Sequence, residues 1–140
     1  MDRTRRHLLG RAAAWLALVP AFHASTVWAA PPIVEIIAFA HPPVQTALQP
    51  LRDWLATQGN KVRVVEIDME SPAAEKRLQA LGLKGHVPIV ILVNGQYRHT
   101  RKDGTGVALV SFPSGNSSPA GVTGGWTIED AQAIIKTQAS

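Results

Sequence analysis

The sequence predicts an α/β domain with a mixed central sheet, and three observations carry this prediction. Residues 33–40 and 88–95 are short, almost continuous apolar runs, typical of strands covered on both faces. Two segments of helical periodicity alternate with strands, which indicates parallel pairing through right-handed crossovers. A later hairpin pattern adds antiparallel strands at one edge. With 140 residues, the chain is long enough for one domain with a single core.

The first strand is expected at residues 33–40 and the first helix at residues 44–58. The helix is predicted by apolar side chains at spacings of three and four, and we count Trp54 among the core residues of that stripe. Pro50 lies inside the helix, and because it lacks an amide hydrogen it is expected to kink it.

The second strand is expected at residues 61–68, where valine and isoleucine alternate with polar residues. Ser71 and Pro72 then form a typical helix start, an N-cap followed by a first-turn proline. The short helix that follows is expected to end near Gly82.

The third strand is expected to end in a turn at Asn94 and Gly95, the residues that favour a tight hairpin. A hairpin with its loop at residues 102–106 follows, and the last strand is expected at residues 107–112. Thr127 is positioned to cap the closing helix.

Residues 113–126 are almost entirely Gly, Ser, Pro, Ala, Asn and Thr, a composition that predicts a mobile surface loop. Two interpretations remain open. The loop is either a simple connection, or a lid in which Phe112 or Trp126 contacts a partner.

Residues 1–29 have the layout of an export signal of the twin-arginine type. Arg5 and Arg6 precede apolar residues, and the stretch that follows is interrupted by Pro20, which makes it a poor membrane span. We expect cleavage near Ala29 or Ala30, a periplasmic location and no stable membrane anchor after cleavage. A retained amphipathic anchor is the alternative. Residues 30–140 would form the folded domain.

The net charge of +4 comes mostly from this signal. Four of the 14 basic residues and one of the 10 acidic residues lie in it, which leaves 10 basic and 9 acidic residues in the rest of the chain. No later segment clusters cations as a nucleic-acid interface requires, and residues 98–102 are interpreted as a solvated strand end. The chain contains no cysteine, so thiol redox chemistry within it is excluded.

The sequence His41-Pro42-Pro43-Val44 follows the first strand and opens the first helix, where the thioredoxin family carries Cys-Pro-Pro-Cys. Pro88, 47 residues after His41, resembles the family's cis-proline at the start of the next strand, and Glu35 lies where thioredoxins carry a buried acid. The chain therefore resembles the thioredoxin-like superfamily. This resemblance implies a three-layer α/β/α fold with a mixed central sheet.

The same resemblance implies a binding protein without the family's chemistry. An imidazole and an aliphatic side chain cannot replace the reactive thiols, so we expect no oxidoreductase activity. A cis bond at Pro88 would expose the backbone of Val87 at a groove, where an extended peptide pairs in strand-like fashion. The expected function is protein or peptide binding in the periplasm, with His41, Pro42, Pro43, Val44, Val87 and Pro88 as the binding residues.

Two alternatives concern the histidines. His41 and His86 would form a copper or zinc site in a metal-handling protein, if the fold brings the two imidazoles together; otherwise no cofactor is expected. A weaker hypothesis makes His41 a general base, but no partner stands at a recognisable spacing. Glu35 is interpreted as a structural acid, hydrogen-bonded in the core or paired with Lys61 or Lys84.

Overall fold

A computed structural model describes residues 29–115 and 117–140. The predicted export signal lies outside the described residues except for Ala29, which is exposed. In chain order the elements are β1 (Ile33–Ala38), α1 (Pro42–Thr57), a 3-10 turn (Gly59–Lys61), β2 (Arg63–Asp68), α2 (Pro72–Ala80), β3 (Ile89–Val93), β4 (Arg98–Thr100), β5 (Gly106–Ala108) and α3 (Ile128–Gln138).

The central sheet has three strands in the order β2-β1-β3. β1 runs parallel to β2, with Val34 beside Val64, and antiparallel to β3, with Val34 beside Val93. On the far side of β3, the segment at Leu109 extends the sheet, because the Ile91 amide donates to the Leu109 carbonyl at 2.9 Å. The predicted α/β class with a mixed sheet is therefore confirmed.

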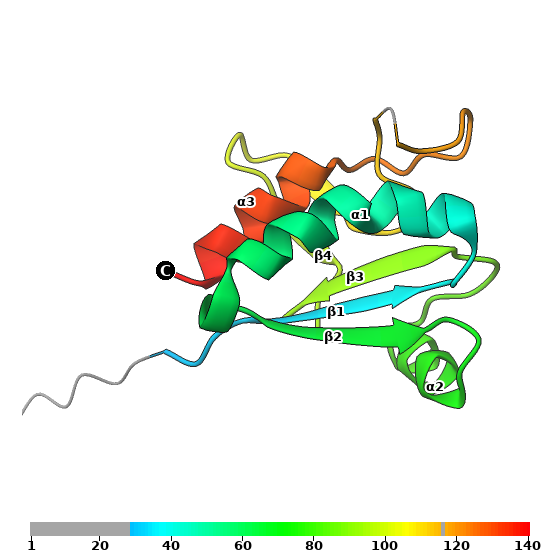
Figure 1. Ribbon diagram of the computed structural model, residues 1–140, viewed down its shortest axis with the longest axis horizontal. Helices are drawn as coiled ribbons and strands as arrows, with labels where there is room; N and C mark the ends of the chain where they lie inside the picture. The colour runs from blue at the N-terminus through cyan, green and yellow to red at the C-terminus, as the bar shows by residue number, and fades with distance from the viewer. Residues whose placement is uncertain (1–28, 116) are drawn as a thin grey trace, which may run out of the picture.

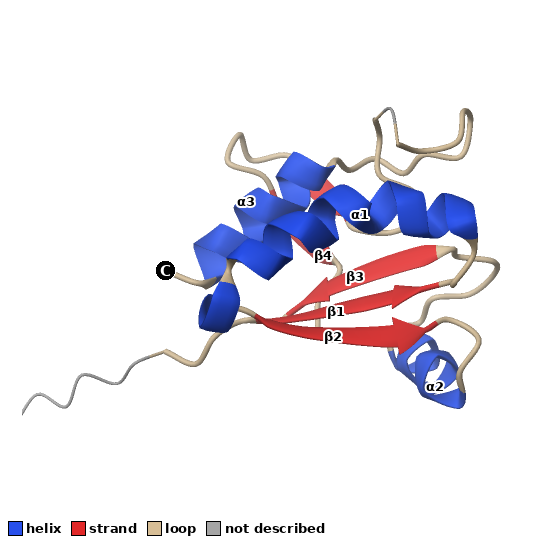
Figure 2. Cartoon of the chain, viewed as in Figure 1, coloured by secondary structure: helices blue, strands red, loops and turns tan. Residues whose placement is uncertain are grey.

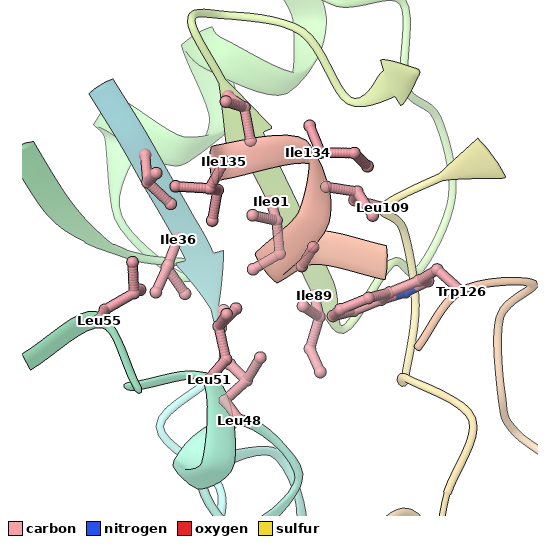
Figure 3. Close-up of a cluster of buried hydrophobic side chains, with 14 of the residues drawn as sticks. Ile36, Leu48, Leu51, Leu55, Ile89, Ile91, Leu109, Trp126, Ile134 and Ile135 are labelled. Atoms are coloured by element: carbon pink, nitrogen blue, oxygen red, sulfur yellow. The ribbon is translucent and has the colours of Figure 1, made fainter. Parts of the chain in front are cut away.

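Helices cover both faces of this sheet (Figures 1 and 2). Side chains alternate across a strand, so β1 contributes Val34 and Ile36 to the face under α1 and α3, and Ile37 to the face under α2. The larger cluster, beneath α1 and α3, is shown in Figure 3. Strands buried on both faces explain the continuous apolar runs in the sequence.

The helix α1 begins at Pro42, two residues before the predicted start. Prolines at the first two helical positions are tolerated because the first amides of a helix have no partner within it. Pro50 lies inside the helix as expected, and its ring is exposed.

The hairpin turn after β3 is confirmed, whereas the extent of the last strand is wrong. Asn94 and Gly95 both have positive φ, 50° and 80°, as a tight two-residue hairpin turn requires. β5 ends at Ala108, short of the predicted residue 112. Beyond it the chain leaves β4 to pair with β3, and Ser111 takes a left-handed φ of 71° that ends regular pairing.

The loop at residues 113–126 ends in a core residue, so the interpretation of Trp126 as a lid contact is wrong. The Trp126 side chain is fully buried, and its indole Nε1 donates to the carbonyls of Val110 and Ser111 at 3.1 and 3.2 Å. Phe112 is buried as well. An indole buried with its N–H satisfied anchors the loop to the core (Figure 3). Trp54, predicted as core, is half-buried against the same cluster.

In the described part of the chain, no helix combines the length and the apolar character that a membrane crossing requires.

Candidate functional site

Two segments far apart in the sequence meet beyond the end of β1. The Phe39 amide donates to the Pro88 carbonyl at 3.3 Å. The Phe39 ring lies 5.2 Å, centroid to centroid, from the imidazole of His41 and also 5.2 Å from that of His86. We call the area formed by Phe39, His41, Pro42, Pro43, His86 and Val87 the Phe39 surface. The structure thus brings the two predicted segments together, with one aromatic ring in contact with both histidines.

Most of the Phe39 surface faces solvent. His41, Pro42, Pro43 and His86 are exposed, while Phe39, Val87 and Pro88 are half-buried. His41 is the N-cap residue of α1, but its side chain makes no capping hydrogen bond, so the imidazole does not stabilise the start of the helix in this way. Phe39 and Val87 also pack against the core clusters, so the free part of this surface is made by the exposed histidine and proline side chains. Exposed rings beside a partly buried phenylalanine are typical of a contact site.

Val44, predicted as a binding residue, belongs to the core instead. Its side chain is only 4% exposed and lies in the cluster beneath α1 and α3. It occupies the third position of α1, where the helix has turned its side chain toward the sheet. The fourth position of the degenerate motif therefore contributes to stability and not to the surface.

The predicted cis bond at Pro88 is wrong, because every peptide bond among the described residues is trans. The trans form is the lower in free energy for an X-Pro bond, by about 0.5–1 kcal/mol. The chain reverses between α2 and β3 through glycines with positive φ, 69° at Gly82 and 88° at Gly85, so the turn does not require a cis bond.

The backbone of Val87 is nevertheless free. Among residues 29–115 and 117–140, neither its amide nor its carbonyl has a hydrogen-bond partner. Because Val87 is half-buried and next to Pro88, which is anchored to Phe39, these two groups are held in a defined position. Backbone groups of this kind are ready to pair with an added extended segment.

A series of side-chain hydrogen bonds, which the sequence did not predict, supports the Phe39 surface through the Phe39 carbonyl. Gln45 Nε2 donates to the Phe39 carbonyl at 2.8 Å, and Arg52 Nη1 donates to Gln45 Oε1 at 2.8 Å. Arg52 also forms a two-point ion pair with Glu66 on β2, at 2.8 and 3.0 Å. Gln45 and Arg52 are seven residues apart on one helix face, which is the only signal the sequence offers for this chain of contacts.

Glu35 is a paired structural acid, but its partner is Arg77 on α2 and not Lys61 or Lys84. The guanidinium donates to both carboxylate oxygens, at 2.6 and 3.0 Å, and the carboxylate side chain is only 14% exposed. The hydrogen bonds from Arg77 to Glu35 raise the pKa of the arginine. A two-point pair of this kind is stronger than a neutral hydrogen bond. Glu35 is thus occupied and does not reach the Phe39 surface as a free acid.

The two candidate metal ligands, His41 and His86, both contact Phe39, but the third histidine does not join them. His99 lies on β4, with its Nε2 2.9 Å from the Gln96 carbonyl. Within the described ranges there is no group of three or more His, Asp or Glu side chains placed to hold a metal ion. Zinc sites in proteins usually use three or four protein ligands.

A well-formed cavity of about 390 Å³ lies elsewhere, between the β4–β5 hairpin and α3. Its most prominent group is Arg101, whose guanidinium binds Asp130 at two points (2.8 and 2.9 Å) and also donates to the carbonyls of Gly106 and Gly125. The hydrogen bonds from Arg101 lower the pKa of Asp130. The guanidinium therefore holds α3 and the end of the loop in place, and its N–H groups are already used in hydrogen bonds within the protein.

Comparisons with known proteins found no match for this chain among family models, curated proteins or solved structures.

Proposed function

We propose that this chain is an exported, redox-inactive, thioredoxin-like protein that binds a polypeptide segment at the Phe39 surface. The fold part of the proposal is supported by the element order, by the strand order β2-β1-β3 followed by the rung at Leu109, and by helices on both faces of the sheet. The resemblance implies a three-layer α/β/α arrangement with a mixed central sheet. The periplasmic location rests on the sequence of residues 1–29 alone.

One observation carries the binding role: the free backbone of Val87 lies beside exposed aromatic and proline side chains. The amide and carbonyl offer strand-like hydrogen bonds, which are independent of sequence, and the rings of His41 and His86 offer contacts that select side chains. The Gln45 and Arg52 contacts hold Phe39 in place, which lowers the entropy that binding must overcome. The trans bond at Pro88 does not remove these features.

Catalysis of thiol–disulfide exchange has no part in the proposal. That reaction begins with the attack of a thiolate on a disulfide sulfur, and the chain has no cysteine to supply one. The exposed residue at the start of α1 is an imidazole, which contacts a ring instead.

The test is selection of peptides from a random library on the immobilised full chain. Selected peptides are then titrated against the wild type and against His41→Ala, His86→Ala and Val87→Asp. His99→Ala is the matched control, because it also removes an imidazole but lies on β4, away from the Phe39 surface.

We expect the three surface variants to bind the selected peptides about tenfold or more weakly, roughly 1.4 kcal/mol, and the control to bind as the wild type does. Amide resonances of Val87 and His86 should shift on binding. Peptides that bind all four variants equally, or a library that yields no peptide tighter than ~1 mM, would contradict the proposal.

Metal handling remains a second candidate, because His41 and His86 both lie against Phe39. Calorimetric titration with Cu(II) and Zn(II) tests it. A metal site requires binding tighter than ~10 µM, roughly −7 kcal/mol, that is lost in His41→Ala and kept in His99→Ala. Binding that survives removal of His41 would contradict this alternative.

A further inference from the structure

The cavity between the β4–β5 hairpin and α3 is separate from the Phe39 surface, and its size suits a small molecule. Its volume of about 390 Å³ lies within the range of ligand sites in proteins. One wall is formed by hairpin residues 99–103. The other wall is formed by α3 residues at spacings of three and four, which place them on one face of the helix.

The two inner charges of the cavity, on Arg101 and Asp130, already satisfy each other. All five N–H groups of the guanidinium are used. They donate to both carboxylate oxygens of Asp130, to the Thr105 hydroxyl and to the carbonyls of Gly106 and Gly125. This pair therefore neutralises itself and leaves recognition of a ligand to other groups.

Two neighbouring residues at the exposed rim of the cavity, Lys102 and Asp103, carry the charges that remain. In the part of the chain that the structure describes, the Lys102 ammonium forms no ion pair. Asp103 accepts from the amide and the hydroxyl of Thr105 with Oδ1 alone, at 2.9 and 2.7 Å. The hydrogen bonds from Thr105 lower the pKa of Asp103, so the carboxylate is charged at neutral pH.

Most of the remaining lining is apolar or already hydrogen-bonded. Ala133 and Ile134 give α3 an apolar side toward the cavity. The Thr137 hydroxyl donates to the Ala133 carbonyl at 2.9 Å. The His99 ring is held by its Nε2, which lies 2.9 Å from the Gln96 carbonyl. The cavity thus combines an apolar wall with one positive and one negative charge at its rim.

We propose that this cavity binds a free α-amino acid with an apolar side chain. Its carboxylate would pair with Lys102, its ammonium with Asp103, and its side chain would pack on α3 at Ala133 and Ile134. Such a ligand carries both charges on one carbon, which matches two charged residues that are adjacent in the chain. A fatty acid or an amine would leave one rim charge unmatched, and a peptide separates its two charges. This inference does not depend on the proposed function.

Titration of the full chain with L-leucine, followed by NMR of the backbone amides, tests the proposal. Both rim charges are exposed, so each ion pair contributes little, and we expect a dissociation constant of about 1 mM. The amide resonances of Lys102, Asp103, Ala133 and Ile134 should shift. The proposal is overturned if leucine causes no shift up to ~20 mM, or if the shifts lie in other parts of the protein.

Three further ligands separate the contributions of leucine. The compound 4-methylpentanoate has the same skeleton without the ammonium, 3-methylbutylamine has it without the carboxylate, and glycine lacks the apolar side chain. Each should bind about fivefold or more weakly than leucine. If 4-methylpentanoate or 3-methylbutylamine binds as tightly as leucine, the cavity does not recognise a zwitterion and the proposal is wrong.

Variants locate the site. Lys102→Met removes the charge and keeps a long side chain, while Asp103→Asn removes the charge and keeps the Oδ1 that accepts from Thr105. Both should weaken leucine binding by about fivefold. Lys84→Met is the matched control, because Lys84 is exposed in the connection between α2 and β3 and does not line the cavity. Equal binding by Lys102→Met and Lys84→Met overturns the proposal.

A cavity-filling variant provides an independent check. Ala133→Phe places a ring against the apolar wall and should abolish leucine binding, with circular dichroism to confirm that the variant folds. Leucine binding that persists in a folded Ala133→Phe protein would place the ligand outside this cavity and overturn the proposal.

Discussion

Two connecting regions of this protein, the loop at residues 113–126 and the Phe39 surface, have opposite compositions and opposite roles. The loop is built from small and polar residues, yet it ends in Trp126, a fully buried side chain. The Phe39 surface follows an apolar strand and is rich in rings and prolines, yet His41, Pro42 and His86 are exposed. Composition alone would assign the core role to the second region and the exposed role to the first.

The comparison shows that the contacts a segment makes, and not its composition, decide whether it stabilises the fold or is left exposed. The end of the loop is fixed by the Trp126 hydrogen bonds and by Arg101, which donates to the Gly125 carbonyl at 2.7 Å. The Phe39 surface has one backbone anchor, from Phe39 to Pro88, and leaves Val87 free. Changes in the loop end should therefore affect stability, and changes in the exposed side chains of the Phe39 surface, His41 and His86, should affect binding alone.

Trp126→Ala should have the largest effect, a loss of about 3–5 kcal/mol in the free energy of unfolding, because it opens a cavity in the main cluster and removes the indole N–H. Urea unfolding at neutral pH measures it. Trp54→Ala is the comparison, since that side chain is only half-buried, and its loss should be smaller. Equal losses would show that the loop end is no better anchored than the rim of α1.

Gly124→Ala should cost about 1–3 kcal/mol, because a Cβ at this position would overlap the Val110 carbonyl oxygen and crowd Trp126. Gly125→Ala is the matched control. It has open space at its Cβ position and needs no left-handed backbone, so the change should stay within about 0.5 kcal/mol. Thermal melting of both variants provides the measurement, and similar melting temperatures would contradict the tight approach at Gly124.

Asp130→Asn should cost about 1–2 kcal/mol near pH 7, because the charge-assisted bonds with Arg101 become neutral while the cap on Thr127 is kept. The pKa of Asp130 is lowered in the folded protein, chiefly by hydrogen bonds from Arg101. Its stabilisation is therefore present above about pH 3.9, the value for aspartate in an unfolded chain, and is lost as pH falls through the lower folded value.

Urea unfolding of the wild type and of Asp130→Asn from neutral pH to about pH 2.5 should thus converge at the acid end. A gap between the two proteins that stays constant over this range would show that Asp130 acts through packing and not through its charge.

His41→Ala should have the smallest effect on stability, within about 0.5 kcal/mol, since the side chain is exposed and makes no capping bond. The same variant is expected to lose peptide binding. A loss of stability comparable to that of Gly124→Ala would place His41 among the structural residues and remove the contrast between the two regions.

The contacts of the Phe39 surface mark the limit of prediction from sequence. The resemblance to the thioredoxin-like superfamily implied that the segments of His41 and His86 would meet, and they do so at Phe39. The contact of both histidines with Phe39, the support from Gln45 and the burial of Val44 were not predictable, because they depend on the rotation of α1 over the sheet. The trans bond at Pro88 also depends on context, since the free-energy difference between the two isomers is only about 0.5–1 kcal/mol.

The sequence by itself determined the order of strands and helices, the tight turn at Asn94 and Gly95, and the structural character of Glu35. These follow from local periodicity, from residues that tolerate positive φ, and from the cost of a buried carboxylate without a partner. Tertiary structure alone decided that the partner is Arg77, that Trp126 belongs to the core and that β2 is an edge strand of the sheet within the described part of the chain. The physical reason is that long-range contacts depend on how several elements pack together, and the sequence of one segment does not determine that packing.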